Sequence, residues 1–412
     1  TWQTEGESSE ACSGVSRLLL RSKTSNEPAN RYWNGIRVNS NGRSKGMSRK
    51  INVLYQNKPC YDIYIEDSFG ALADALEPFA LADRKVCIVT DSNVNPLYGA
   101  EVEDMIGAIS GECVRYVFPA GEESKTLDTV KEIYKFLIGN HFNRKDLLIA
   151  LGGGVVGDLT GYTAATYLRG IEFIQIPTTL LSQADSSIGG KTGVDFDGYK
   201  NMVGAFYMPR LVYMNMATLQ SLNDRQFYSG FAEVMKSALI KDGNFYEWLI
   251  DQMYEICERD VETLSEMVER SCIIKKLVVE KDPLEKGDRA LLNFGHTIGH
   301  AIEKYMNFTM THGECVALGC VAAAFISWKK NWLSMEEYYE IRDMFVPFYL
   351  PISIDNLDIE KVLQLTKSDK KAENGYIKFI LLKKVGKALI DKTVTDDEIR
   401  EALQELNFNE ND

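Results

Sequence analysis

The chain has 412 residues, of which 45% are hydrophobic and 25% are charged, and its formal net charge at pH 7 is −13. At about 100 to 200 residues per domain, this length predicts two or three domains and excludes a small disulfide-stapled scaffold. The acidic balance argues against nucleic acid as a partner. No apolar run reaches the ~18 to 20 residues of a membrane-spanning helix, so we expect no membrane partner.

Residues 1–46 are rich in Ser, Asn, Arg and Gly and show no sustained hydrophobic periodicity. We expect a disordered extension there. The alternative is an organelle presequence, against which the four glutamates of the segment argue.

Short apolar, β-branched runs alternate with helical stretches between residues 47 and 223. This pattern predicts an α/β domain with a parallel sheet, because strands covered by helices on both faces read as continuous apolar runs. The clearest strands are residues 85–90, 147–151 and 173–176.

The run at 147–151 continues into Gly152, Gly153, Gly154, Val155, Val156, Gly157 and Asp158, and then into a helix-like stretch through Tyr167. A strand, a glycine turn and a helix N-terminus together form a site for an anion such as a pyrophosphate. Glu172 opens the next strand, whereas a strict dinucleotide fingerprint has an acidic residue closing it. We therefore expect a nucleotide site with different geometry, and a glycine turn without a ligand is the alternative.

From residue 224 to 412 the periodicity becomes helical, which predicts an all-α domain with a small hairpin across 376–390. The expected helices cover residues 227–241, 244–259, 261–281 and 336–344. The eight cysteines contain no C-x-x-C pair, which favours reduced thiols and a cytoplasmic location.

Three of the four histidines lie within 17 residues, at His296, His300 and His312. His296 and His300 are four residues apart and so share one helix face. Two imidazoles and one carboxylate are a common catalytic zinc site. Glu233 is the candidate carboxylate, although spacing alone does not select it. Buried core histidines are one alternative; a split in which two histidines bind the metal and the third donates a proton or binds phosphate is another.

Several motifs together resemble those of the 3-dehydroquinate synthase family, over about residues 51–395. The matching stretches are PAGEESK (119–125), GGGVVGD (152–158), PTTLLSQADSSIGGKTGVD (177–195), KNMVGAF (200–206), GFAEVMK (230–236), LNFGHTIGHAIE (292–303) and HGECVALG (312–319). The resemblance implies an NAD-binding α/β domain at 47–223, a helical metal- and substrate-binding domain at 224–412, an active site between them, and a homodimer.

The resemblance also implies site residues. Zinc or cobalt would be held by Glu233, His296 and His312, while His300 would face a small sugar-acid phosphate, 3-deoxy-D-arabino-heptulosonate 7-phosphate. Further substrate or catalytic residues would be Arg169, Asp185, Lys191, Asn201, Lys236, Lys275, Glu285, Arg289, Asn293 and one of Lys370 and Lys371. NAD would be held by Asp91, Asn93, Glu122, Lys125, Gly153, Gly154, Val155, Asp158, Thr178, Thr179, Lys191, Lys200, Ser221, Leu222 and Gln226. Lys200 is also one of the cations that the motifs supply for the anionic substrate, together with Arg169, Lys191, Lys236, Lys275 and Arg289. Ser221 and Gln226 stand where relatives carry Thr and Glu.

The reaction implied is that of a carbon–oxygen lyase of the shikimate pathway, which leads to aromatic amino acids. NAD would oxidise the substrate transiently, phosphate would be eliminated, and reduction and an intramolecular aldol step would give 3-dehydroquinate. The alternatives are another sugar-phosphate cyclase, a metal-dependent polyol dehydrogenase, or a silent scaffold with the same fold. Lys275, Arg289 and Asn293 favour a substrate that carries a carboxylate.

Overall fold

The computed structural model describes residues 48–368 and 378–408. The expected disordered extension at 1–46 lies outside the described residues, as do Lys370 and Lys371. Within the described part, none of the helices combines the length and apolar character needed to cross a membrane.

A seven-stranded, mostly parallel sheet occupies the first half of the described chain, in the order β1-β2-β9-β6-β5-β3-β4. The three strands expected from sequence are confirmed as β3, β5 and β6. The antiparallel pair β1 and β2 at one edge was not expected. The strands are β1 Arg49–Tyr55, β2 Lys58–Glu66, β3 Lys85–Asp91, β4 Glu112–Phe118, β5 Leu147–Gly152, β6 Glu172–Pro177 and β9 Leu211–Asn215.

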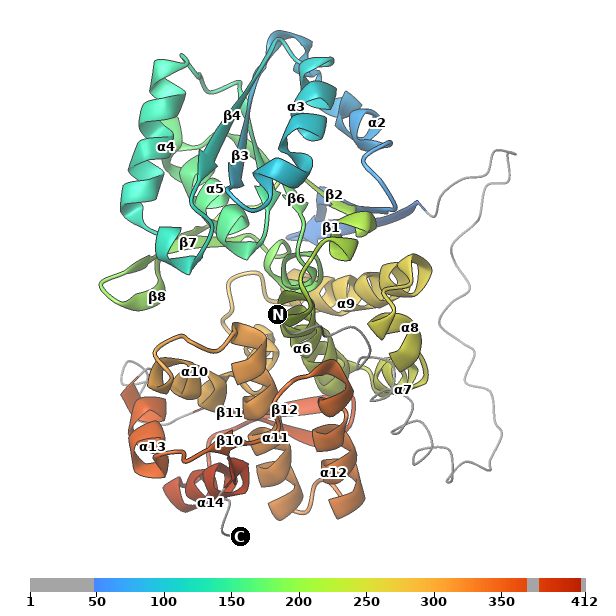
Figure 1. The fold of residues 1–412 in the computed structure, drawn as a ribbon, viewed down its shortest axis with the longest axis vertical. Coiled ribbons are helices and arrows are strands. Elements are labelled where there is room, and N and C mark those ends of the chain that lie inside the picture. The colour runs from blue at the N-terminus through green and yellow to red at the C-terminus, as the bar shows by residue number, and fades with distance from the viewer. Residues whose placement is uncertain (1–47, 369–377, 409–412) are drawn as a thin grey trace, which may run out of the picture. The chain divides into compact units, whose positions relative to one another are not determined.

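Helices cover both faces of the parallel strands (Figure 1). Alternate residues of β5 point to opposite faces, so Ile149 joins the core beneath α2 and α3 and Leu148 joins the core beneath α4 and α5. This two-sided burial is why the strand is apolar throughout. The helices are α2 Leu72–Leu76, α3 Ala100–Gly107, α4 Leu127–Gly139 and α5 Gly154–Thr166.

A separate antiparallel hairpin, β7 Lys191–Phe196 and β8 Tyr199–Phe206, packs against α5. The close approach depends on Gly161, where an added Cβ would lie 2.4 Å from Thr192 Cγ2. Short 3-10 and π helices complete the first half: η1 Glu77–Phe79, η2 Leu81–Asp83, η3 Asn95–Gly99, η4 Glu122–Ser124, η5 Tyr167–Arg169, η6 Ser182–Ser186 and η7 Met216–Gln220.

The second half is helical, as expected, with the predicted hairpin present as β11 Phe379–Lys384 and β12 Lys387–Asp391. The prediction of a single helix at 244–259 is wrong, because the backbone leaves the helical region at Gln252 and the segment forms α7 and α8.

The helices of the second half are α6 Asp224–Lys241, α7 Gly243–Asp251, α8 Met253–Cys257, α9 Val261–Lys281, η8 Asp288–Asn293, α10 His296–Tyr305, α11 His312–Lys329, α12 Met335–Asp343, η9 Val346–Phe348, α13 Ile359–Ser368 and α14 Asp396–Leu406. Two short strands, β10 Ile354–Asp355 and β13 Asn407–Phe408, pair in parallel.

One apolar cluster joins the sheet edge to the helices, since Ile63 of β2 and Val212 of β9 share it with Phe231 of α6 and Ala317 of α11. The boundary expected between residues 223 and 224 falls immediately before α6, and the division into two domains there stays a prediction.

The backbones of helices α10 and α11 pack so closely that no side chain fits between them at two glycines. An added Cβ at Gly319 would lie 1.8 Å from the backbone oxygen of Gly295, and one at Gly299 would lie 2.7 Å from that of Cys315. Gly295 also has φ 79°, a left-handed conformation that glycine adopts without strain. These glycines bring the first residues of the two helices close together.

We predict that Gly319→Ala destabilises the fold by about 1 to 3 kcal/mol, because the methyl group has no space between the two backbones. Gly139→Ala is the matched control: it also replaces a helical glycine, but its Cβ would meet nothing within 4 Å. Urea unfolding of both variants measures the difference. Equal stabilities would contradict the close packing of α10 on α11.

Candidate active site

Three helices converge on one cluster of metal-ligating side chains. His296 is the first residue of α10, His312 is the first residue of α11, and Glu233 lies in the middle of α6. The N-terminus of α11 rests on α6 at Gly313, where an added Cβ would lie 2.0 Å from the backbone oxygen of Ser229. This contact places His312 beside Glu233.

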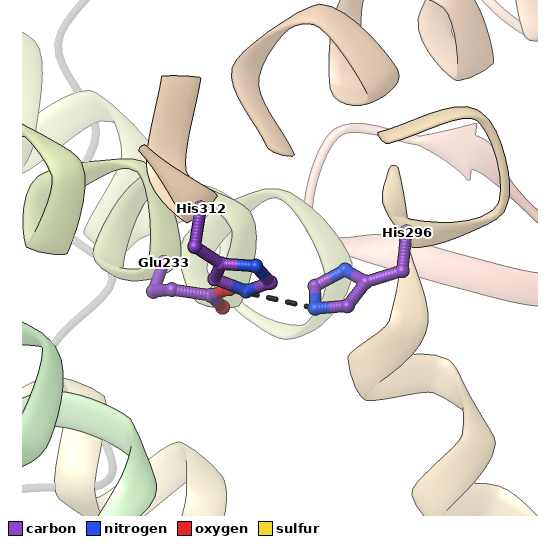
Figure 2. Close-up of side chains that lie close together, drawn as sticks. All are labelled: Glu233, His296 and His312. Atoms are coloured by element: carbon purple, nitrogen blue, oxygen red, sulfur yellow. Dashed lines mark hydrogen bonds and ion pairs between the residues drawn. The ribbon is translucent and has the colours of Figure 1, made fainter. Parts of the chain in front are cut away.

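Glu233, His296 and His312 face one another (Figure 2). Glu233 Oε1 lies 3.2 Å from His312 Nε2 and 3.5 Å from His296 Nε2. One ligand atom from each residue lies within 4.8 Å of the other two. Two imidazole nitrogens and a carboxylate oxygen this close together match the donor set of a three-ligand zinc or cobalt site.

Two members of the cluster, Glu233 and His296, have the charge state that a metal ligand needs. Burial lowers the pKa of His296 to about 3, so its ring is neutral and can offer a lone pair. Burial alone would favour the protonated form of Glu233, but Lys236 and the two histidines hold its pKa well below the usual range. Glu233 is only 2% exposed, and it forms an ion pair with Lys236 one helical turn away.

A second cluster shares His312 and was missed in the sequence. His300, Glu303 and His312 also bring ligand atoms within 4.8 Å of one another. Although burial opposes it, the carboxylates of Glu233 and Glu303 raise the pKa of His312 to about 9. The available signal was Glu303 three residues after His300, a spacing that shares one helix face.

The remaining predicted substrate residues surround the cluster from both halves of the chain. Lys275 Nζ lies 2.7 Å from Asp185 Oδ1, so α9 contacts η6. Arg289 is 2% exposed and donates from its two terminal nitrogens to the backbone oxygens of Gly189 and Pro283. Burial, together with Lys236 and Arg289, lowers the pKa of Lys275.

Glu285 contacts two other predicted substrate residues. It forms an ion pair with Lys191 of the β7–β8 hairpin and accepts from Asn293 Nδ2 at 3.2 Å. Arg169 is exposed at the end of η5, and no hydrogen bond or ion pair links its side chain to another described residue. Side-chain contacts therefore link several of the predicted substrate residues to one another, and the part of Arg169 stays a prediction.

The predicted NAD residues gather at the carboxyl edge of the sheet. Strands β3, β5 and β6 are parallel neighbours, so the residues that follow them lie side by side. These are Asp91 at the end of β3, Gly153 after β5 and Thr178 after β6. Such an edge is where α/β proteins bind nucleotides.

Lys125 connects this edge to the hairpin. Its Nζ lies 2.6 Å from Asp158 Oδ2 on α5 and donates to Asn201 Oδ1 at 2.5 Å on β8. Lys200 lies 3.9 Å from Glu122 and 2.8 Å from Glu303. Ser221 contacts Tyr98 through their hydroxyls. Of the others, Gly154, Val155, Thr179 and Leu222 are half-buried, and Asn93 and Gln226 are exposed.

Comparison with known proteins gives the family. The profile described as 3-dehydroquinate synthase N-terminal matches residues 115–229, and the one described as 3-dehydroquinate synthase C-terminal matches residues 230–372. The chain belongs to the 3-dehydroquinate synthase family. A 3-dehydroquinate synthase of Acetivibrio thermocellus is 43% identical over 350 residues, which cover 85% of this chain and 97% of the relative.

Solved structures with the same architecture include other cyclases. A 2-epi-5-epi-valiolone synthase from Streptomyces hygroscopicus subsp. jinggangensis, with NAD+ and Zn2+ bound, has a TM-score of 0.77 at 26% identity and covers 86% of this chain and 99% of its own. A 2-deoxy-scyllo-inosose synthase complexed with carbaglucose-6-phosphate, NAD+ and Co2+ has a TM-score of 0.77 at 25% identity, covering 87% and 99%. The expected fold class, a parallel-sheet domain followed by helices, is confirmed.

The two overlapping clusters differ in which substitution should remove the metal. If Glu233, His296 and His312 form the metal site, we expect Glu233→Ala to lose bound zinc, because a three-ligand site that loses one ligand binds far more weakly. His300→Ala is the matched control and should retain zinc, which elemental analysis of the dialysed proteins measures. Loss of zinc in the His300 variant and its retention in the Glu233 variant would place the metal in the second cluster instead.

Proposed function

We propose that this chain is a 3-dehydroquinate synthase that converts 3-deoxy-D-arabino-heptulosonate 7-phosphate to 3-dehydroquinate and phosphate, with NAD and zinc or cobalt as cofactors. The observation that carries the proposal is the cluster of Glu233, His296 and His312, which lies among buried cations in a chain of this family. When bound, NAD accepts and returns a hydride at the substrate, while the metal polarises the substrate oxygens beside it.

The residues at the sheet edge fit NAD. Helix α5 has no side-chain cap at its N-terminus, so its first N–H groups can face a pyrophosphate. An added Cβ at Gly153 would lie 3.1 Å from Thr179 Cγ2, so a larger residue would crowd the turn between β5 and α5. Thr178 Oγ1 is buried and has no hydrogen-bond partner among the described residues. These features support a polar, anionic ligand at the turn.

The cations of the site suit a substrate with a phosphate and a carboxylate. Lys236 and Arg289 are each 2% exposed and Lys275 is 6% exposed, so water screens their charges weakly. Arg289 Nε is buried without a partner among the described residues, which leaves one donor for a ligand. An arginine and a lysine close to each other favour a substrate that carries a carboxylate.

The side chains near the metal cluster would position the substrate and move protons. The ring centroid of His300 lies 5.1 Å from that of His296 and 5.9 Å from that of His312, and the residue is exposed, so it can face a bound substrate. We infer that Lys191, Asn201 and Arg169 bind the phosphate side of the substrate. Their part is to hold the leaving group and to stabilise developing charge.

The proposal also includes a cytoplasmic location and a homodimer. The seven cysteines within the described residues are free thiols, which supports a reducing, cytoplasmic location. The homodimer rests on the resemblance to the family alone, and sedimentation of the purified chain tests it.

We expect the purified chain to release phosphate from 3-deoxy-D-arabino-heptulosonate 7-phosphate with catalytic amounts of NAD and without net accumulation of NADH. A chelator should abolish the release and added zinc should restore it. Phosphate and the NADH absorbance are followed together. Accumulation of NADH with a polyol would instead identify a dehydrogenase, and phosphate release from a sugar phosphate without a carboxylate would identify a different cyclase.

A further inference from the structure

We propose that Glu303 is a positioning residue whose single carboxylate orients both His312 for the metal and Lys200 for the substrate. The inference rests on the proposed function, because it assigns a metal to His312 and a substrate to Lys200. Glu303 Oε1 lies 2.8 Å from Lys200 Nζ and 3.8 Å from His312 Nδ1. One buried oxygen atom therefore faces a metal-ligand candidate and a substrate-binding candidate at once.

The first contact of the Glu303 carboxylate is with the ring of His312. Its Nε2 points toward Glu233 Oε1, so Nδ1 is the nitrogen that faces Glu303. An imidazole that offers Nε2 to a metal must keep its proton on Nδ1, and a carboxylate facing that proton fixes the tautomer and the ring plane. Glu303 is 3% exposed, so this contact is shielded from water.

The second contact of Glu303 is with Lys200, the half-buried second residue of β8. Its side chain is 31% exposed while that of Glu303 is 4% exposed, so a buried carboxylate holds a lysine that solvent and ligands can still reach. Lys200 also lies over the ring of Phe308, at 4.9 Å, and Phe308 N donates to the backbone oxygen of Glu303. Of the two carboxylates near Lys200, Glu303 is the closer, at 2.8 Å, whereas Glu122 lies 3.9 Å away.

Helix α10 makes this double contact possible. Glu303 follows His300 by three residues and His296 by seven, so all three share one helix face. The glycines that bring α10 against α11 also bring Glu303 to His312. An uncompensated carboxylate in such a buried position would be costly, and its two cationic or proton-donating neighbours explain why it is tolerated.

The first test is zinc affinity, measured by competition with a chromophoric chelator and without substrate. We expect Glu303→Gln to weaken zinc binding about 10-fold and Glu303→Ala about 100-fold, the range found when the partner of a metal-bound histidine is removed. The control is Asp391→Asn, which neutralises another buried carboxylate, 7% exposed and 3.7 Å from Lys330, in the helical half. Its zinc affinity should not change.

The second test separates the two tasks. With zinc saturating, Glu303→Gln should raise KM more than it lowers kcat, because Lys200 loses its anchor. In a Lys200→Met background the same substitution should leave KM unchanged yet still weaken zinc binding. Melting of the metal-free proteins checks that each variant folds.

Unchanged zinc affinity in both Glu303 variants would overturn the inference, as would additive effects on KM. If Glu303→Ala abolished zinc binding while Glu233→Ala retained it, Glu303 would be a metal ligand and not a positioning residue. The zinc measurements need no turnover. A wild-type chain that binds zinc as expected but releases no phosphate would therefore refute the proposed function without deciding this inference.

Discussion

The buried carboxylate of Glu233 is the constraint on which the helical half depends. A charge that is 2% exposed is tolerated only when opposite charges or hydrogen-bond donors compensate it. Here Lys236 lies on the same helix, whereas His296 and His312 come from two others. Three helix segments must therefore meet at one point, and a metal ion would replace the proton that the cluster otherwise shares.

Close helix packing is the structural consequence. The two imidazoles can reach one carboxylate only if α10 and α11 approach at backbone distance, which the glycine pair Gly295 and Gly319 permits. A larger residue at either position would separate the helices and with them the histidines. The glycines of this region thus serve the site through packing.

Charge compensation extends from the cluster toward the sheet. Lys236 pairs with Glu233, and Lys275 pairs with Asp185, so carboxylates and ammonium groups alternate from α6 to η6. Arg289 adds a cation that forms no ion pair with a carboxylate among the described residues and donates to backbone oxygens instead. A chain with a net charge of −13 can therefore still present local positive charge to an anionic substrate.

The sequence predicted the features that depend on local patterns. Strands β3, β5 and β6 were predictable because burial on both faces leaves a continuous apolar run, and the glycine turn because it follows such a strand directly. The histidine cluster was predictable because only one other histidine occurs in the chain.

The role of Glu303 was not predictable, since an acidic residue three positions after a histidine is also an ordinary pair on a helix surface. Only the fold shows that it is buried against β8. The break at Gln252 was hidden because the helical periodicity continues through it.

The β7–β8 hairpin is where the two halves of the site become dependent on each other. Asn201 accepts from Lys125, which is paired with Asp158 on the helix of the predicted NAD site. The preceding residue, Lys200, is paired with Glu303 on the helix of the metal cluster. Because adjacent residues of one strand make these two contacts, a displacement of the hairpin disturbs both. A ligand at the glycine turn and a metal at the three-ligand cluster would therefore each act on this hairpin, the first through Asn201 and the second through Lys200.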